Sequence, residues 1–571
     1  MRRTPFSILP ALTLLLATGS AGAYTRATAS AADGRGIAWD LANHDTYVPL
    51  IDDGALLYRL HAAGSADVGN GDDLAAVARA FRTWSGISTS ALRGARDQDT
   101  ANMTTLDDGE FAIFWNESST VVDQGTSTTD DDVNIAGALA VAFIYQVVSG
   151  PETGEIRDAN IVFNGADFLW TASTYPEANH YDIESVALHE IGHTLGLAHS
   201  PVAVASLFPR LGAGSRLARK LSSDDIAGVT AIYPGGNSAA NRGTITGTVS
   251  NGAPVLGAMV WARDSAGGLL AHATSDANGV YLMAGLPPGP VTLHTEPVNA
   301  ASGFYLFSAA NMGPYYAAAQ RDFHYTGGLG VEVLAGNTVI ADLTPAAGTP
   351  ALEIKLLSRS GAWSNIRTFL RRGESGIRIG VAGPGLPTAG IPLSISGTDI
   401  TVENTTFNMV AGFPVVEITV TVAADAALGA RDLVVSAGGE TTVALGAVDI
   451  LSADELLQPP EPGGAQAAEV SGLQAAIVGP GLDLAWEPSA GTSWYRLYRG
   501  DLAALRTGTY GHAVVAGGCY LSAAQASLMD DIDSPSAFFY LVNGVAEDET
   551  VGPAGTASNG IPRPLGFDSC P

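Results

Sequence analysis

The chain has 571 residues, of which 57 are acidic and 28 are basic, giving a formal net charge of −29. At about 150 residues per domain, this length predicts about three to five domains. The negative charge argues against nucleic acid or an anionic membrane as a partner, because both bind basic surfaces.

The beginning of the chain has the pattern of a secretory signal peptide. Arg2 and Arg3 supply its positive end, residues 6–17 form its apolar run, and small residues suit cleavage before Tyr24. No later segment reaches about 18 uninterrupted apolar residues, so we expect the protein not to be transmembrane. The sequence therefore predicts a signal peptide at 1–23, a short N-terminal segment at 24–36, and a secreted, extracellular mature protein.

Residues 37–235 mix strand and helix patterns, as an α+β domain does. Short apolar runs predict strands at 56–60, 111–115 and 160–163. An apolar stripe at helical spacing predicts a first helix with Asp72 or Asp73 as its N-cap, and Asp182 suits the N-cap of a second helix. The three expected helices cover 72–84, 181–197 and 222–232.

The most informative stretch of this domain runs from His189 to His199. On a helix, His189 and His193 lie one turn apart on the same face and can share a metal ion. A continuing helix, rising about 1.5 Å per residue, would carry His199 roughly 9 Å past His193, too far to bind the same ion. Gly196 removes this difficulty, because glycine readily adopts the left-handed conformation that ends a helix and turns the chain back.

These residue types are those of a catalytic zinc site. Neutral imidazoles of His189, His193 and His199 would hold one Zn²⁺ and leave a fourth position for water. Glu190 stands beside the first ligand but points elsewhere, so it could act as the base toward a zinc-bound water. A lone HExxH occurs by chance on ordinary helices, but here a suitably placed glycine and a third histidine extend the pattern.

The motif and the segments 154–164, 181–188 and 221–228 resemble the matrixin branch of the metzincin peptidases. The resemblance implies a zincin fold, with a twisted mixed sheet over the active-site helix. It implies that Leu139 and Ala140 belong to a sheet edge that pairs with an extended peptide substrate. It also implies that Phe208 and Pro209 wall the specificity pocket. Leu207 stands at the family's Met-turn position, where replacing methionine by leucine conserves volume and should cost under about 1.5 kcal/mol.

Beyond residue 235 the sequence pattern changes to short strand-like runs broken by glycine and proline. This pattern is typical of all-β sandwiches. Residues 241–350 resemble a carboxypeptidase regulatory-like module, 351–455 look Ig-like, and 465–571 resemble a fibronectin type III-like module. A Pro- and Gly-rich linker is expected at 456–464. The two cysteines, Cys519 and Cys570, both fall in the last module and predict one disulfide bond there.

The sequence thus predicts a secreted zinc metalloendopeptidase that acts on a protein or peptide substrate. The β-modules are expected to attach it to the extracellular matrix, another polymer or a cell surface. An alternative is a non-catalytic adhesin or scaffold that carries a metzincin-type binding domain. Calcium could bind among Asp130, Asp131 and Asp132, although an exposed acidic loop explains these residues equally well.

Overall fold

The computed structural model divides into two compact units, Met1–Leu457 and Gln458–Pro571. In the first unit it describes residues 2–7, 22–23, 25, 27, 36–42, 50–52, 54–105, 107–124, 132–236, 238–301 and 305–455. In the second it describes strands that form two sheets, in the orders β29-β30-β33 and β32-β31-β34. Their bounds are β29 (Gln474–Val478), β30 (Gly481–Ala485), β31 (Trp494–Asp501), β32 (His512–Val514), β33 (Gln525–Leu528) and β34 (Phe538–Val545).

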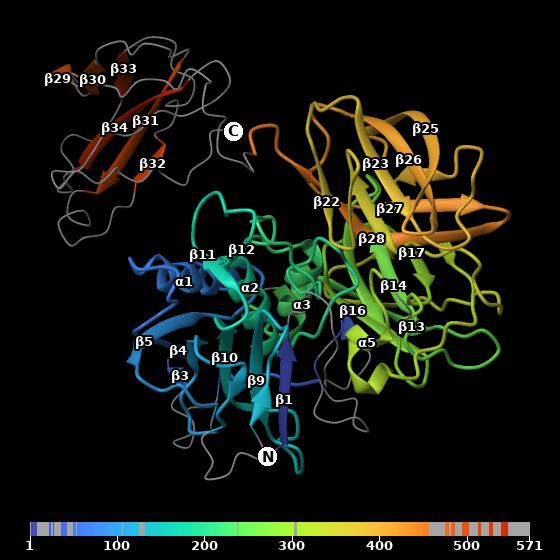
Figure 1. Ribbon diagram of the computed structural model, residues 1–571, viewed down its shortest axis with the longest axis horizontal. Coiled ribbons are helices and arrows are strands. Elements are labelled where there is room, and N and C mark those ends of the chain that lie inside the picture. Colours follow the sequence, from blue (N-terminus) through green and yellow to red (C-terminus); the bar gives the residue numbers. More distant parts are fainter. Residues whose placement is uncertain are drawn as a thin grey trace. The chain divides into compact units, whose positions relative to one another are not determined.

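Residues 37–235, here the first domain, supply six strands of a seven-stranded mixed sheet, and residues 2–7 supply the seventh. Its path is β1-β9-β10-β6-β4-β3, with β5 also paired to β4, and β9 runs antiparallel to β10 (Figure 1). The strands are β1 (Arg2–Ser7), β3 (Ile51–Asp52), β4 (Ala55–His61), β5 (Gly94–Thr100), β6 (Ala112–Asn116), β9 (Ala140–Gln146) and β10 (Ile156–Asn164). Two small pairs accompany it: β7 (Val121–Val122) with β8 (Val133–Asn134), and β11 (Leu169–Thr171) with β12 (His180–Asp182).

Three helices complete the first domain: α1 (Asp72–Ser85), α2 (Ile183–Thr194) and α3 (Ser223–Ile232). The apolar stripe of α1 is buried and packs against α2 (Figure 1). The expected N-cap of α1 is wrong, because Gly71 takes that position in the left-handed conformation. Asp73 cannot serve there because its carboxylate accepts from the backbone N–H of Ser65 instead. The N-cap expected for α2 is confirmed: the Asp182 carboxylate accepts from the N–H of Ser185 at 2.9 Å.

Residues 241–350, here the second module, form two facing sheets. One has the order β16-β13-β19 and the other β18-β17-β14-β15-β2. Alternate residues of β13 and β16 are buried, as the period of a strand with one covered face requires. The strands are β2 (Gly22–Ala23), β13 (Gly243–Thr248), β14 (Met259–Arg263), β15 (Leu269–Thr274), β16 (Val280–Leu286), β17 (Gly289–Glu296), β18 (Thr326–Val333) and β19 (Thr338–Ile340). Short helical turns are α4 (Ser238–Asn241), α5 (Ala309–Met312) and η1 (Pro314–Tyr316).

Residues 351–455, here the third module, are also a two-sheet sandwich. The sheet orders are β21-β20-β23-β26-β25 and β22-β28-β27-β24. The strands are β20 (Leu356–Arg359), β21 (Ala362–Ser364), β22 (Thr368–Arg371), β23 (Ile377–Ala382), β24 (Leu393–Ile395), β25 (Ile400–Val410), β26 (Phe413–Val422), β27 (Gly429–Ala437) and β28 (Glu440–Leu451). The expected fold class, a mixed α+β domain followed by β-rich modules, is confirmed. Among the described residues, no helix is long and apolar enough to cross a membrane.

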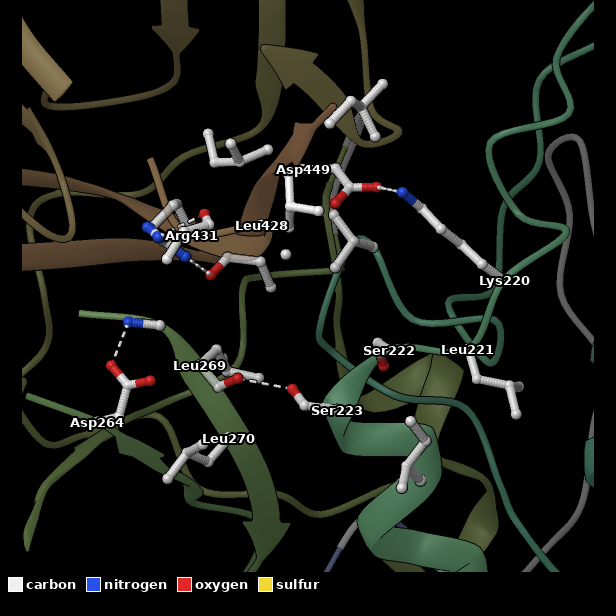
Figure 2. Close-up of a pocket in the computed structure, with 18 of the residues that line it drawn as sticks. Lys220, Leu221, Ser222, Ser223, Asp264, Leu269, Leu270, Leu428, Arg431 and Asp449 are labelled. Carbon is white, nitrogen blue, oxygen red and sulfur yellow. Dashed lines mark hydrogen bonds and ion pairs between the residues drawn. The ribbon is translucent and has the colours of Figure 1, made fainter. Parts of the chain in front are cut away.

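The first domain and the two modules pack into one unit. A pocket of about 510 Å³ lies where all three meet, and apolar side chains such as Leu221, Leu269 and Leu428 line much of it. At its wall Lys220 of the first domain forms an ion pair with Asp449 of the third module at 2.9 Å (Figure 2). The Ser223 hydroxyl donates to the Leu269 carbonyl of the second module at 2.6 Å (Figure 2). The first domain and the two modules are therefore joined by polar contacts as well as by apolar side chains.

Candidate metal centre

The candidate centre is built on α2, in which every residue from Ile183 to Thr194 is buried. His189 and His193 lie one turn apart, so their side chains leave the helix in nearly the same direction. Their Nε2 atoms are 2.9 Å apart. Two ligands of a tetrahedral zinc ion, each bonded at about 2.0 Å, lie about 3.3 Å apart, so this separation is close to what one shared ion requires.

The third histidine reaches the other two because α2 ends abruptly. Gly196 has φ 92°, a backbone conformation that residues with a Cβ rarely adopt. A Cβ at this position would stand 2.3 Å from the backbone carbonyl oxygen of Ile37, so only glycine fits. The chain then turns back, and the His199 ring lies 5.3 Å from His189 and 4.9 Å from His193, measured between ring centroids. One ring nitrogen of each histidine falls within 4.8 Å of the others.

The second ring nitrogen of each histidine faces a backbone carbonyl. The Nδ1 atoms of His189, His193 and His199 lie 2.6, 2.8 and 3.0 Å from carbonyl oxygens, which belong to Ser206, Leu197 and Asn311. A carbonyl can only accept, so each Nδ1 must carry the proton. The Nε2 lone pairs are therefore directed at the common point, which is the arrangement of metal-binding histidines in proteins.

Electrostatics also favour the ligating form of these rings. Burial lowers the pKa of His189 well below its usual value, and the neighbouring His199 lowers it further. Burial likewise lowers the pKa of His193, with contributions from the other two rings. The lowered pKa values of His189 and His193 favour their neutral form, which is the form that binds a metal. The donor set and its protonation both fit Zn²⁺.

Glu190 follows the first ligand directly on α2 and is fully buried. Its carboxylate is not one of the three converging ligands, which are all imidazole nitrogens. Glu190 can therefore gain or lose a proton without removing a ligand from the metal.

Leu207 packs against the helix that carries His189 and His193. Its exposed fraction is 2 %, and it belongs to the main apolar core. It packs against α2 at Gly192, where a Cβ would stand 2.6 Å from the Leu207 Cδ2 atom. The glycine therefore lets Leu207 approach the helix closely, and leucine fills the space at the position where the family resemblance expects methionine.

The expected substrate-binding residues occupy two places. Leu139 and Ala140 are buried at the start of β9, just before the stretch whose outer edge pairs with β1. Phe208 is 1 % exposed and Pro209 is buried too. Phe208 packs against side chains of the second module, among them Phe307. The two cysteines expected to form a disulfide bond, Cys519 and Cys570, lie outside the described residues, as do Asp130 and Asp131 of the expected calcium loop.

The sequence pattern missed the groups that hold the histidines. The Asp225 carboxylate, near the start of α3, accepts from the Ser206 N–H at 2.9 Å and so fixes the residue whose carbonyl faces His189. Burial, together with Asp224, raises the pKa of Asp225 to about 6. Its place in the capping box of α3 was the available signal. Asn311 acts through its backbone carbonyl, for which no residue type is diagnostic.

Comparison with known proteins agrees with this geometry. Residues 52–234 match the profile of the matrixin family, and residues 242–302 match the carboxypeptidase regulatory-like domain. Metalloendoproteinase 5-MMP of Arabidopsis thaliana is 54% identical over 56 residues, which are 10% of this chain and 15% of the relative. Metalloendoproteinase 1 of Glycine max is 32% identical over 162 residues, which are 28% of this chain and 44% of the relative.

A third relative is the hatching enzyme of Paracentrotus lividus, 29% identical over 182 residues, or 32% of this chain and 26% of the relative. The matches thus span less than half the length of each of these relatives. Among solved structures, the major pilin subunit BcpA of Bacillus cereus aligns with 55% of this chain and 91% of its own, at 10% identity and a TM-score of 0.13, too low to support an argument. The chain thus contains a region that matches the matrixin family and has three histidines that fit a zinc site, followed by a region that matches the carboxypeptidase regulatory-like domain.

Proposed function

We propose that this chain is a secreted zinc-dependent endopeptidase. The observation that carries the proposal is the convergence of His189, His193 and His199 on one point, with the buried Glu190 directly after the first of them in the sequence. The matrixin profile and the metalloendoproteinase relatives support the same chemistry. The alternative of a non-catalytic adhesin is less favoured because every residue type that the reaction needs is present.

In the proposed mechanism the three imidazoles hold the metal, and their Nδ1–H bonds to carbonyls keep the rings in place. A bound zinc ion would supply Lewis-acid polarisation of the scissile carbonyl and make a nearby water more acidic. Glu190 accepts the proton of the attacking water at a carboxylate oxygen. It then delivers that proton to the leaving amine, so that the carboxylate is regenerated after each turnover.

The peptide is proposed to bind along β9 by strand addition. In support, the outer edge of β9 already accepts an extended segment of this chain: β1 pairs antiparallel with it, from Ser7 opposite Val141 to Arg2 opposite Gln146. The β1 residues belong to the proposed signal peptide, so removal of residues 1–23 would free this edge for a substrate. Backbone hydrogen bonds would then supply affinity that does not depend on substrate sequence.

Metal removal provides the direct test. The full chain, secreted through its own leader, should contain one zinc per molecule by elemental analysis and should hydrolyse casein. Dialysis against 1,10-phenanthroline should abolish hydrolysis, because the metal supplies the polarising charge, and added Zn²⁺ should restore it. A protein that binds one zinc but cleaves neither casein nor gelatin would favour the adhesin, and cleavage that survives complete zinc removal would contradict the proposal.

The attachment role is assigned to the second unit, residues 458–571. The support is that residues 458–571 form a compact unit of their own. Deleting residues 458–571 should reduce retention of the enzyme on insoluble collagen or cell-wall material at least several-fold. It should leave hydrolysis of a soluble peptide within about twofold of the full chain, because the centre lies wholly in the first unit. Unchanged retention in a co-sedimentation assay would contradict the assignment.

A further inference from the structure

We propose that the second and third modules are parts of the metal centre, with the Asn311 carbonyl positioning His199 and the Arg367 guanidinium positioning the loop that holds His189. This inference rests on the proposed function, and it concerns positioning residues rather than catalytic ones. These two modules would then help to build the active site, whereas the sequence predicted that they attach the enzyme to a matrix or a surface.

The loop that follows the third ligand is the first observation. Every residue from Ser200 to Arg210 is buried, although the segment contains no helix or strand. A buried irregular segment must find partners for its backbone N–H and C=O groups, because each unpaired group costs about as much as a lost hydrogen bond. The partners of this loop therefore show what holds it in place.

The third module supplies several of these partners. The N–H groups of Ala203 and Val204 donate to the carbonyls of Leu445 and Gly446 in β28, at 2.9 and 3.1 Å. Gly446 permits this approach, because a Cβ there would stand 2.5 Å from the side chain of Val202. The loop is thus joined to β28 by its backbone.

Arg367, which directly precedes β22, completes the attachment. Its guanidinium donates to the Val204 carbonyl at 2.7 Å and to the Ala205 carbonyl at 3.2 Å, and also approaches the Leu217 carbonyl at 3.3 Å. The next residue, Ser206, presents the carbonyl that receives the Nδ1–H of His189 at 2.6 Å. Arg367 therefore fixes the peptide units immediately before the one that orients this ligand.

The second module acts on the third ligand. The α5 turn places the Asn311 carbonyl 3.0 Å from Nδ1 of His199, and the two residues are 112 positions apart in the sequence. The Asn311 side chain holds the same turn, because its Oδ1 accepts from the Ser308 N–H at 3.0 Å. Next to this contact, Phe208 packs with apolar residues of the second module: Met259, Val298, Phe307, Met312 and Tyr316.

Two of the three histidines thus depend on groups outside the matrixin domain. Partners of this kind set the tautomer and direction of a ligating ring, and losing one typically weakens metal binding about 10- to 100-fold. Phe208, expected to wall a specificity pocket, is buried against the second module.

The test compares full-length variants by chelator competition for Zn²⁺ and by the visible absorption spectrum after Co²⁺ substitution. Arg367→Ala should weaken zinc binding about 10- to 100-fold and shift the Co²⁺ spectrum. Asn311→Ala keeps the carbonyl that faces His199 and removes only the side-chain acceptor that holds the α5 turn, so it should shift the spectrum with a smaller loss of affinity. Arg367→Lys and Asn311→Asp keep a donor and an acceptor in the same places, so they should recover part of the affinity. Arg371→Ala is the matched control for Arg367→Ala. Arg371 contacts Phe369 and Glu374, which both belong to the third module.

Wild-type affinity and an unchanged Co²⁺ spectrum in both alanine variants would overturn the inference while leaving the proposed function intact. Failure of the wild-type protein to bind zinc would instead overturn the proposed function. If Arg367→Ala does not fold, the lysine variant decides: weaker zinc binding in a folded Arg367→Lys protein supports the inference, and wild-type binding contradicts it.

Discussion

Replacing Glu190 with Gln should lower kcat/KM for peptide hydrolysis by about 100- to 10,000-fold, the usual contribution of a general base. Glutamine has nearly the same shape as glutamate but cannot accept a proton from water. Glu190 is fully buried, so bulk solvent cannot easily replace it as the proton acceptor. Zinc content should stay at one per molecule, because the three ligands are imidazoles. Steady-state kinetics on a fluorogenic peptide, together with elemental analysis, would measure both quantities.

Glu184→Gln is the matched control, since it removes another buried carboxylate from the same helix. Glu184 forms an ion pair with Arg79 at 2.7 Å and is not among the converging metal-ligating groups. Its loss should lower stability modestly and leave kcat/KM within about threefold of wild type, as expected for a partly exposed ion pair. Equal losses of activity in the two variants would assign the Glu190 effect to helix stability, and loss of zinc in Glu190→Gln would assign it to the metal site.

The core of the site could be predicted because its signals are local. His189 and His193 are four positions apart on one helix, and the glycine requirement at Gly196 follows from the reach of His199 alone. Asp182 could be identified as an N-cap from its position before an apolar run. At α1 the same reasoning predicted an aspartate as the N-cap. The N-cap is instead Gly71 in the left-handed conformation, and the Asp73 carboxylate accepts from the Ser65 N–H. Capping is decided by tertiary contacts when two candidates compete.

The outer part of the site could not be predicted because its contacts are distant in sequence. Arg367 and Val204 are 163 positions apart, and the side chains that cover the loop come from two different modules. Alternating strands predict a sandwich, but they do not say which edge or turn of it packs on another domain. For Asn311 the contact is made by a backbone carbonyl, which every residue has.

Gly196→Ala should lower the free energy of unfolding by about 3 kcal/mol or more and weaken zinc binding as well. Two costs combine: the left-handed φ of 92° strains any residue with a Cβ, and the new atom would stand 2.3 Å from the Ile37 carbonyl oxygen. The backbone must shift to relieve this collision, and His199 lies only three residues further on. Urea denaturation, with and without excess Zn²⁺, would measure both effects.

Gly150→Ala separates the two costs. Gly150 has nearly the same φ, 93°, but a Cβ there would meet nothing within 4 Å. Its replacement should cost only the conformational term, about 1–2 kcal/mol, and leave zinc affinity unchanged. If Gly196→Ala destabilised the protein no more than Gly150→Ala and kept full zinc affinity, the close contact with Ile37 would not be what directs His199 to the metal. The difference between the two variants therefore measures how strongly this turn determines the site.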